Sequence, residues 1–399
     1  MKRRDFILSS TGAALAMAGS SALGATAEQP KKSLYAPTRY AYVADRISPF
    51  IAIVDIISGE YIDSIYVGMR PQMMEVARDD AMLAASSMEV SGIFFYNLKT
   101  RESRLMRLPS PVYQMMFVPQ TKLLAIGLRD QVGIIDYENF TAKIFSRRFD
   151  SDERMTPLNT YYSLLFSTFS QSFWVLDEDR PMIYQKFASE DVDSPWREID
   201  LSKRVRTGSG LGVGVASAED YLLAVTTDDG SEGLVYYPEE DRLISTGPMR
   251  TVGTTNEPML TPYIDAYTKH VIFADVEGNV ALFDLDKDRE KAQRFHVNFS
   301  PRIIRTGWLE STWILGGDKG LMFQSFEDPS DRKIYRFPAE VMYIWVTGDS
   351  KTALVSIDEQ RPQLFRYDVK TREMLEPIRV RGVGMAALIR MGSNNSICY

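Results

Sequence analysis

The sequence predicts an all-β chain folded as an eight-bladed β-propeller, with seven blades as the alternative. Short apolar strands recur at near-constant spacing, and each is followed about ten residues later by a partner strand. Helical periodicity is nearly absent. Four strands in each unit of about 40 to 45 residues is the repeat pattern of propellers. A single four-stranded sheet cannot bury both of its faces, whereas a ring of such sheets can.

The repeat is visible in the positions of the paired strands. The first strands start at residues 41, 82, 123, 164, 222, 271, 312 and 352, so the steps are 41, 41, 41, 58, 49, 41 and 40. Their partners span 50–56, 92–98, 133–139, 173–179, 233–239, 279–285, 320–326 and 363–369. Many partners end in an aromatic or apolar residue followed by Asp or Asn, as in Tyr96-Asn97 and Phe283-Asp284. Gly, Pro, Asp and Asn bound these runs, as expected of strands.

Further segments complete the predicted blades. A polar outer strand follows the pair, as at 61–67 and 332–337, and an inner strand precedes it at 73–77, 112–118, 213–217, 303–308 and 341–347. Region 151–210 decides between eight and seven blades, and we expect Trp196–Asp200 to be its outer strand after an insertion.

The chain ends are predicted to close the ring. The first unit lacks an inner strand of its own, since only residues 35–39 precede it. Gly382–Met391 follows the last unit and is placed like the inner strand of the second blade. We therefore expect it to pair with the first blade, which removes two exposed sheet edges.

The N-terminus predicts export. Lys2-Arg3-Arg4-Asp5-Phe6-Ile7-Leu8 resembles a twin-arginine signal, and the Ala/Gly/Ser-rich segment after it ends in Ala25-Thr26-Ala27, a small-x-small cleavage pattern. We expect a signal peptide at 1–27, a linker at 28–38 and one propeller domain at 39–399, located in the periplasm. No stretch after the signal has the pattern of a transmembrane helix.

Two motifs of the first blade resemble YVTN-type propeller repeats. Tyr42-Val43-Ala44-Asp45 matches the Tyr-Val-x-Asn element, and Ile53–Glu60 matches the Val-Ile-Asp-x-x-Thr-Gly turn. The likeness returns at Leu364–Arg372 and is loose elsewhere. It implies a WD40-like propeller similar to the quinohaemoprotein amine dehydrogenase β-subunit and related periplasmic propellers. The resemblance bears on the fold much more than on the function.

Composition narrows the classes of function. Net charge is −7 and the pI is about 5.2, which disfavours nucleic-acid binding. Only two histidines occur, His270 and His296, without metal-like spacing, so we expect packed or surface residues. The single cysteine, Cys398, excludes an intrachain disulfide. No catalytic motif or metal set is recognisable, and no cofactor can be named.

Three loops resemble binding motifs without completing them. Asp284–Asp288 starts like an EF-hand but lacks the sixth-position glycine and has Phe295 at position twelve. Asp228–Gly233 is interpreted as a polar hairpin. Gly208–Gly214 is rich in glycine but does not precede a helix, as a phosphate-binding loop would. We therefore interpret it as a loop entering an inner strand.

Arginines supply the candidate ligand site. Connections from an outer strand to the next inner strand meet at one mouth of a propeller channel, and several carry arginine, a residue suited to carboxylates and phosphates. The candidates are Arg70, Arg204, Arg206, Arg250, Arg302 and Arg381, with Arg305 on an inner strand. The alternative is that each arginine pairs with a nearby acid.

These observations favour a periplasmic accessory propeller that binds a partner protein or an anionic ligand, in a redox or cofactor-maturation pathway. One alternative is an oxidoreductase or oxidoreductase subunit that holds a tetrapyrrole or quinone at the channel mouth. Another is a lactonase-type hydrolase.

Overall fold

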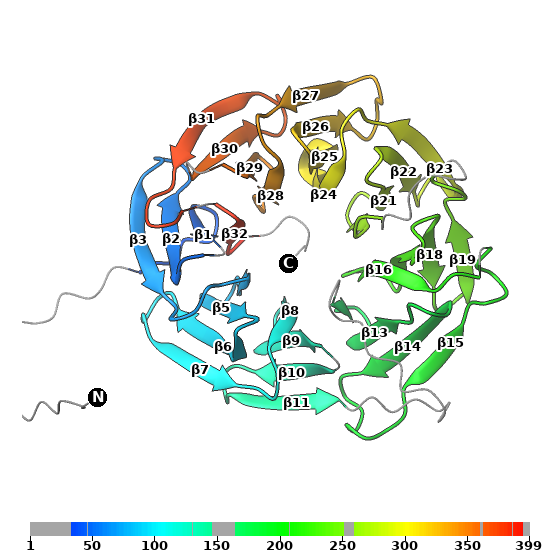
Figure 1. Cartoon of the computed structure of the whole chain (residues 1–399), viewed down its shortest axis with the longest axis horizontal. Helices are drawn as coiled ribbons and strands as arrows, with labels where there is room; N and C mark the ends of the chain where they lie inside the picture. The colour runs from blue at the N-terminus through cyan, green and yellow to red at the C-terminus, as the bar shows by residue number, and fades with distance from the viewer. Residues whose placement is uncertain are drawn as a thin grey trace, which may run out of the picture. The chain divides into compact units, whose positions relative to one another are not determined.

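Eight four-stranded antiparallel sheets form a ring in the computed structural model of the chain (Figure 1). The structure describes residues 33–45, 47–129, 131–145, 164–206, 208–250, 259–359, 362–384 and 386–393. Within these ranges the only helical element is a 3₁₀ turn, η1 (Trp308–Glu310). The prediction of an eight-bladed all-β propeller is confirmed, and the seven-bladed alternative is excluded.

The strands are grouped here by blade, from the inner to the outer strand. Blades 1 to 4 are β32 (Leu388–Met391), β1 (Tyr40–Ala44), β2 (Phe50–Asp55), β3 (Tyr61–Tyr66); β4 (Met73–Val76), β5 (Met82–Ser87), β6 (Val90–Asn97), β7 (Ser103–Arg107); β8 (Val112–Val118), β9 (Leu123–Leu128), β10 (Val132–Asp136), β11 (Thr141–Phe145); β12 (Leu165–Ser167), β13 (Ser172–Leu176), β14 (Met182–Phe187), β15 (Arg197–Asp200). Blades 5 to 8 are β16 (Leu211–Ala216), β17 (Leu223–Thr227), β18 (Gly233–Tyr237), β19 (Arg242–Ser245); β20 (Tyr263–Asp265), β21 (His270–Ala274), β22 (Asn279–Asp284), β23 (Asp288–His296); β24 (Pro301–Gly307), β25 (Thr312–Gly317), β26 (Gly320–Ser325), β27 (Arg332–Arg336); β28 (Val341–Val346), β29 (Thr352–Ile357), β30 (Gln363–Asp368), β31 (Met374–Arg379).

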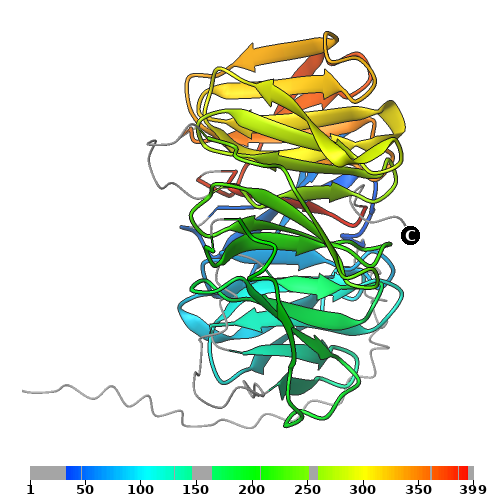
Figure 2. The same ribbon diagram turned by 90° about the vertical axis from the view of Figure 1, so that its right-hand side faces the viewer.

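This topology gives the ring two distinct faces. Every blade is an antiparallel meander entered from the outer strand of the preceding blade, so all inner strands run in the same direction. The outer-to-inner connections and the turns between second and third strands share one face, which we call the connection face. Counted from the ring axis, the inner strand of each blade is its first strand. Turns between first and second strands lie on the other face, which we call the return face. Figure 2 shows the ring from the side.

Pairing of the two chain ends closes the ring, as predicted. β32 pairs antiparallel with β1, with Val43 opposite Ile389 and Ala44 opposite Leu388. The segment before β32 is also fixed to the first blade, because the Gly384 amide donates to Asp45 Oδ2 at 2.5 Å. Blade 1 therefore combines strands from both ends of the chain (Figure 1).

One strand of blade 4 was assigned wrongly from the sequence. The segment at 164–168 was expected to be the first strand of a pair, but it contains β12, the inner strand of its blade. The segment expected to be its partner contains β13, and Arg197–Asp200 forms the outer strand as predicted. A three-residue inner strand and a second strand are both short apolar runs, so their spacing could not distinguish them. The inner strand of blade 6, β20, was not predicted and is equally short.

The core consists of apolar layers between neighbouring sheets. Between blades 6 and 7, Ile272 and Leu282 pack with Trp313 and Leu315, all of them essentially inaccessible to solvent. Second strands are buried almost completely because both of their faces meet an adjacent blade. Burial of these branched and aromatic side chains is the main stabilising contribution of such a ring.

The recurrent acid or amide at the strand ends has a local structural role. Asp55 Oδ1 accepts the amides of Ile57 and Ser58 at 2.9 and 3.2 Å, and Asn97 Oδ1 does the same two and three residues ahead. Asp136 repeats this arrangement, and the amide and side chain of Asn139 lower its pKa. The repeat signature therefore encodes Asx turns.

Several sequence predictions concern residues outside the described ranges. They include the signal at 1–27, most of the linker, and Cys398. Within the described residues, no helix has the length and apolar character needed to cross a membrane.

Candidate functional site

The predicted arginines of the connection face are held mainly by individual carboxylates. Arg70 pairs with Glu89, Arg204 with Asp241, Arg206 with Glu232, Arg250 with Asp275, and Arg302 with Glu340. Arg204 reaches the start of an outer strand, where its Nη1 donates to Asp241 Oδ1 at 2.8 Å. Arg381 is exposed in the connection that leads to β32. The structure therefore distributes these charges over separate ion pairs around the ring.

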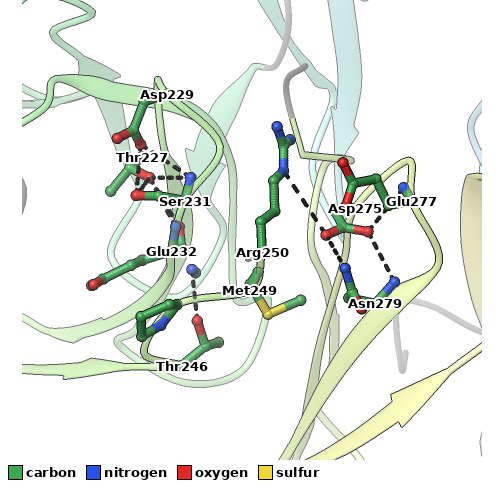
Figure 3. A network of polar contacts seen from close by, with 12 residues as sticks. Thr227, Asp229, Ser231, Glu232, Thr246, Met249, Arg250, Asp275, Glu277 and Asn279 are labelled. Carbon is green, nitrogen blue, oxygen red and sulfur yellow. Dashed lines mark hydrogen bonds and ion pairs between the residues drawn. The ribbon is translucent and has the colours of Figure 1, made fainter. Parts of the chain in front are cut away.

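Acids of the second-to-third-strand turns supply several of these partners. Arg250 is the most buried example, with 8% of its side chain exposed, and it lies between blades 5 and 6 (Figure 3). Its Nε lies 3.9 Å from Asp275 Oδ2. Asp275 itself accepts the amides of Glu277 and Asn279. Burial would raise the pKa of Asp229 on the neighbouring turn, but hydrogen bonds from Thr227 and Ser231, together with the charge of Arg250, lower it overall. This contact serves to join two blades.

Arg305 has a different environment from the other candidates. It lies on inner strand β24, and its guanidinium carbon is 5.8 Å from the ring centre of Tyr263 and 5.6 Å from that of Tyr343. These rings come from the inner strands of the two adjacent blades, β20 and β28. Nη1 of Arg305 donates to the carbonyl of Ile304 at 2.7 Å. No carboxylate among the described residues lies within ion-pair distance of this half-buried cation.

The row of side chains continues onto the closing strand. The guanidinium carbon of Arg390, on β32, is 5.1 Å from the ring centre of Tyr343 and 5.3 Å from that of Trp345. Arg390 also donates to the Tyr343 hydroxyl and binds Glu75 of β4 through Nε at 2.9 Å and Nη2 at 2.6 Å. Burial alone would lower the pKa of Arg390, but Glu75 and Tyr343 raise it overall.

We call this row the axial cluster. It spans the inner strands of five successive blades and comprises Tyr263, Arg305, Tyr343, Trp345, Arg390 and Glu75. Arg390 is neutralised by Glu75, with 13% and 25% of the two side chains exposed. Arg305 contributes a positive charge that has no carboxylate partner among the described residues, and the tyrosines contribute aromatic surface. Such a set can hold an anionic group by charge-assisted hydrogen bonds while the rings contact a planar body.

The other motifs noted in the sequence have structural roles. His270 is buried and stacks on Phe326 with ring centres 4.0 Å apart, whereas His296 is exposed. Asp284 Oδ1 accepts the amides of Asp286 and Lys287, which makes the EF-hand-like segment an Asx turn. The described residues contain no group of three or more His, Cys, Asp or Glu side chains placed to bind a metal.

The two remaining loops agree with their predicted roles. Asp229 Oδ1 accepts the Ser231 amide at 3.0 Å within a hairpin turn. The glycine-rich segment leads into β16, and a Cβ on Gly210 would lie 1.7 Å from the Glu178 carbonyl oxygen. Glycine is therefore required there by close backbone contact rather than by a phosphate.

Sequence reasoning identified Arg305 but missed its neighbours Tyr263, Tyr343, Arg390 and Glu75. A signal for the charged residues was present, because the inner strands read Ile-Ile-Arg, Leu-Ile-Arg and Met-Met-Glu, with one charge after two apolar residues. A charged residue inside an otherwise apolar inner strand indicates that polar side chains line the centre of the ring.

Comparisons with known proteins agree on the fold. No protein-family model matches the chain, and no curated protein matches it by sequence. The YVTN resemblance therefore remains a prediction from the sequence.

Solved structures do match. Dihydro-heme d1 dehydrogenase NirN in complex with DHE aligns with a TM-score of 0.70 at 11% identity, over 93% of this chain and 78% of NirN. Apo AztD from Citrobacter koseri aligns with a TM-score of 0.55 at 11% identity, over 88% of this chain and 97% of AztD. The C-terminal WD40 domain of Sif2 gives 0.56 at 11% identity, over 78% of this chain and 86% of that domain. At this identity the likeness concerns the propeller fold alone.

Proposed function

We propose that this protein is a ligand-binding accessory propeller whose axial cluster holds a planar, carboxylate-bearing molecule of the tetrapyrrole type. The observation that carries the proposal is Arg305, a half-buried cation between two tyrosine rings without a carboxylate partner among the described residues. A partly buried charge of this kind is stabilised further when an opposite charge pairs with it. A ligand carboxylate would provide that compensation.

The residues fit such a ligand in two respects. Arg305 can donate paired hydrogen bonds to a carboxylate, which is the geometry that guanidinium groups favour. Tyr263 and Tyr343 lie on either side of Arg305 and add aromatic surface that can contact a flat conjugated body. NirN, whose structure contains DHE, provides an analogy from a protein of the same fold.

We further propose that the protein works in the periplasm, within a redox or cofactor-maturation pathway. This part rests on the twin-arginine-like segment Lys2–Leu8. Changing Arg3 and Arg4 to Lys should retain the protein in the cytoplasm on cell fractionation. Unchanged export would contradict a twin-arginine route.

Titration with protoporphyrin tests the ligand proposal. The wild-type protein should shift the porphyrin absorption band and quench tryptophan fluorescence in a saturable manner. Arg305→Gln should weaken binding about tenfold or more, the effect expected for loss of a hydrogen bond to a charged group.

Arg302→Gln is the matched control. It removes the same charge from the same strand, but from an exposed guanidinium already paired with Glu340. It should bind protoporphyrin within about twofold of wild type. Equal binding by Arg305→Gln and wild type would refute the assignment.

A further inference from the structure

The return face carries an exposed aromatic surface that the proposed ligand site does not use. Turns between first and second strands in four successive blades present a large apolar side chain. These are Phe169 in blade 4, Tyr221 in blade 5, Tyr267 in blade 6 and Leu309 in blade 7. Phe169, Tyr267 and Leu309 are 54%, 58% and 51% exposed. We call these four residues, three of which are aromatic, the aromatic arc.

Contacts between aromatic rings hold some of these side chains in place. The rings of Phe169 and Tyr221 stack across blades 4 and 5 with centres 6.1 Å apart. The ring of Tyr267 contacts that of Trp308 in the next blade, with ring centres 4.1 Å apart. Preformed aromatic surfaces of this kind are typical of protein-binding sites, since rigid rings lose little conformational entropy on binding.

A cavity of about 310 Å³ opens beside the arc, between blades 5 and 6. Its walls include the rings of Phe169, Tyr221 and Tyr237. They also carry five acids, Glu219, Asp220, Glu239, Glu240 and Asp286.

Two of these five acids are neutralised. Lys269 Nζ binds both carboxylate oxygens of Asp220 at 2.9 and 2.8 Å, and Arg242 Nε lies 3.2 Å from Glu240. The other three, Glu219, Glu239 and Asp286, are exposed and have no basic partner among the described residues. Among the described residues, the cavity therefore combines aromatic side chains with a surplus of three negative charges.

From these features we propose that the aromatic arc and this cavity dock a basic segment of a partner protein, with an arginine or lysine side chain entering the cavity. Aromatic faces attract guanidinium and ammonium groups, and the three acids strengthen that attraction. The exposed apolar side chains of Phe169, Tyr267 and Leu309 would bury area against the rest of the segment. A second copy of this chain fits poorly, because two such surfaces would bring like charges together.

A short fluorescent peptide of alternating arginine and serine is a direct probe, measured by anisotropy with the full chain. The matched peptide carries citrulline instead of arginine, which keeps the shape and removes the charge. The arginine peptide should bind about tenfold more tightly, and its affinity should fall as salt increases. Equal binding of the two peptides would overturn the proposal.

Substitutions locate the surface. The triple variant Glu219→Gln, Glu239→Gln, Asp286→Asn should weaken arginine-peptide binding about tenfold. The control triple variant Asp318→Asn, Asp358→Asn, Glu376→Gln removes the same charge from exposed sites elsewhere and should stay within about twofold. An equal loss in both variants would show that only net charge acts, which overturns the proposal.

Two further measurements test where the peptide binds and whether the aromatic arc binds a second copy of the chain instead. Phe169→Ser should weaken the peptide complex, whereas Arg305→Gln should leave it unchanged, so failure here is distinguishable from failure at the axial cluster. Sedimentation should show a monomer. A dimer that Phe169→Ser dissociates would replace the proposed partner with a second copy of the chain.

Discussion

Closure of the ring by the C-terminal strand can be tested through Ile389. This side chain is fully buried between blades 8 and 1, in the same apolar layer as Val43, Leu354 and Leu364. Ile389→Ala removes three carbons at about 0.8 kcal/mol each and leaves a cavity. Together these effects should cost about 2.5 to 5 kcal/mol of unfolding free energy. Because domains are stable by only about 5 to 15 kcal/mol, this is a large fraction of the total.

Urea unfolding followed by tryptophan fluorescence measures this cost. Ile57→Ala is the matched control, since Ile57 is 69% exposed and its loss should change stability by no more than about 0.5 kcal/mol. Removing residues 383–399 deletes the whole closing strand and should abolish cooperative unfolding or solubility. If Ile389→Ala unfolds at the same urea concentration as Ile57→Ala, or the truncated protein unfolds like the full chain, the chain ends do not close the ring.

Two further predictions concern single sites. Gly210→Ala should be far less stable in urea than Gly208→Ala, because its new Cβ would meet the Glu178 carbonyl oxygen while Gly208 has open space and only a left-handed φ to satisfy; equal losses would contradict the close contact. Burial lowers the pKa of His270 despite the opposing charges of Asp284 and Asp265, so the unfolded chain takes up a proton near pH 6.5 that the folded chain resists. Wild-type stability should therefore fall relative to His270→Gln as the pH decreases below about 6.5, and parallel pH profiles of the two proteins would refute this.

Local sequence signals accounted for most of the fold. Paired apolar runs ending in Asp or Asn predicted second and third strands, because the Asx turn that follows them needs that side chain. The apolar run at Gly382–Met391, which has no partner strand of its own, predicted closure of the ring. Prediction failed where an inner strand is only three residues long, at Leu165–Ser167 and Tyr263–Asp265, because so short an apolar run carries no distinguishing period.

The candidate site was harder to predict because it depends on which side chains face one another across blades. Arginine positions could be found in the sequence, but their acidic partners lie elsewhere in the chain, as with Arg302 and Glu340. The rings beside Arg305 are separated from it by about 40 residues on either side, one blade each way. Only the assembled ring shows that Arg305 lacks a carboxylate partner among the described residues while Arg390 has one.

The central claim is that a ligand carboxylate binds Arg305, and a thermodynamic cycle between protein and ligand tests it most directly. Binding of protoporphyrin and of its uncharged dimethyl ester would be measured for wild type and for Arg305→Gln in the same solvent. The coupling between the guanidinium and the carboxylates should be about 1.5 kcal/mol or more, with the ester insensitive to the substitution. A coupling near zero, with both ligands losing affinity equally or not at all, would contradict the account.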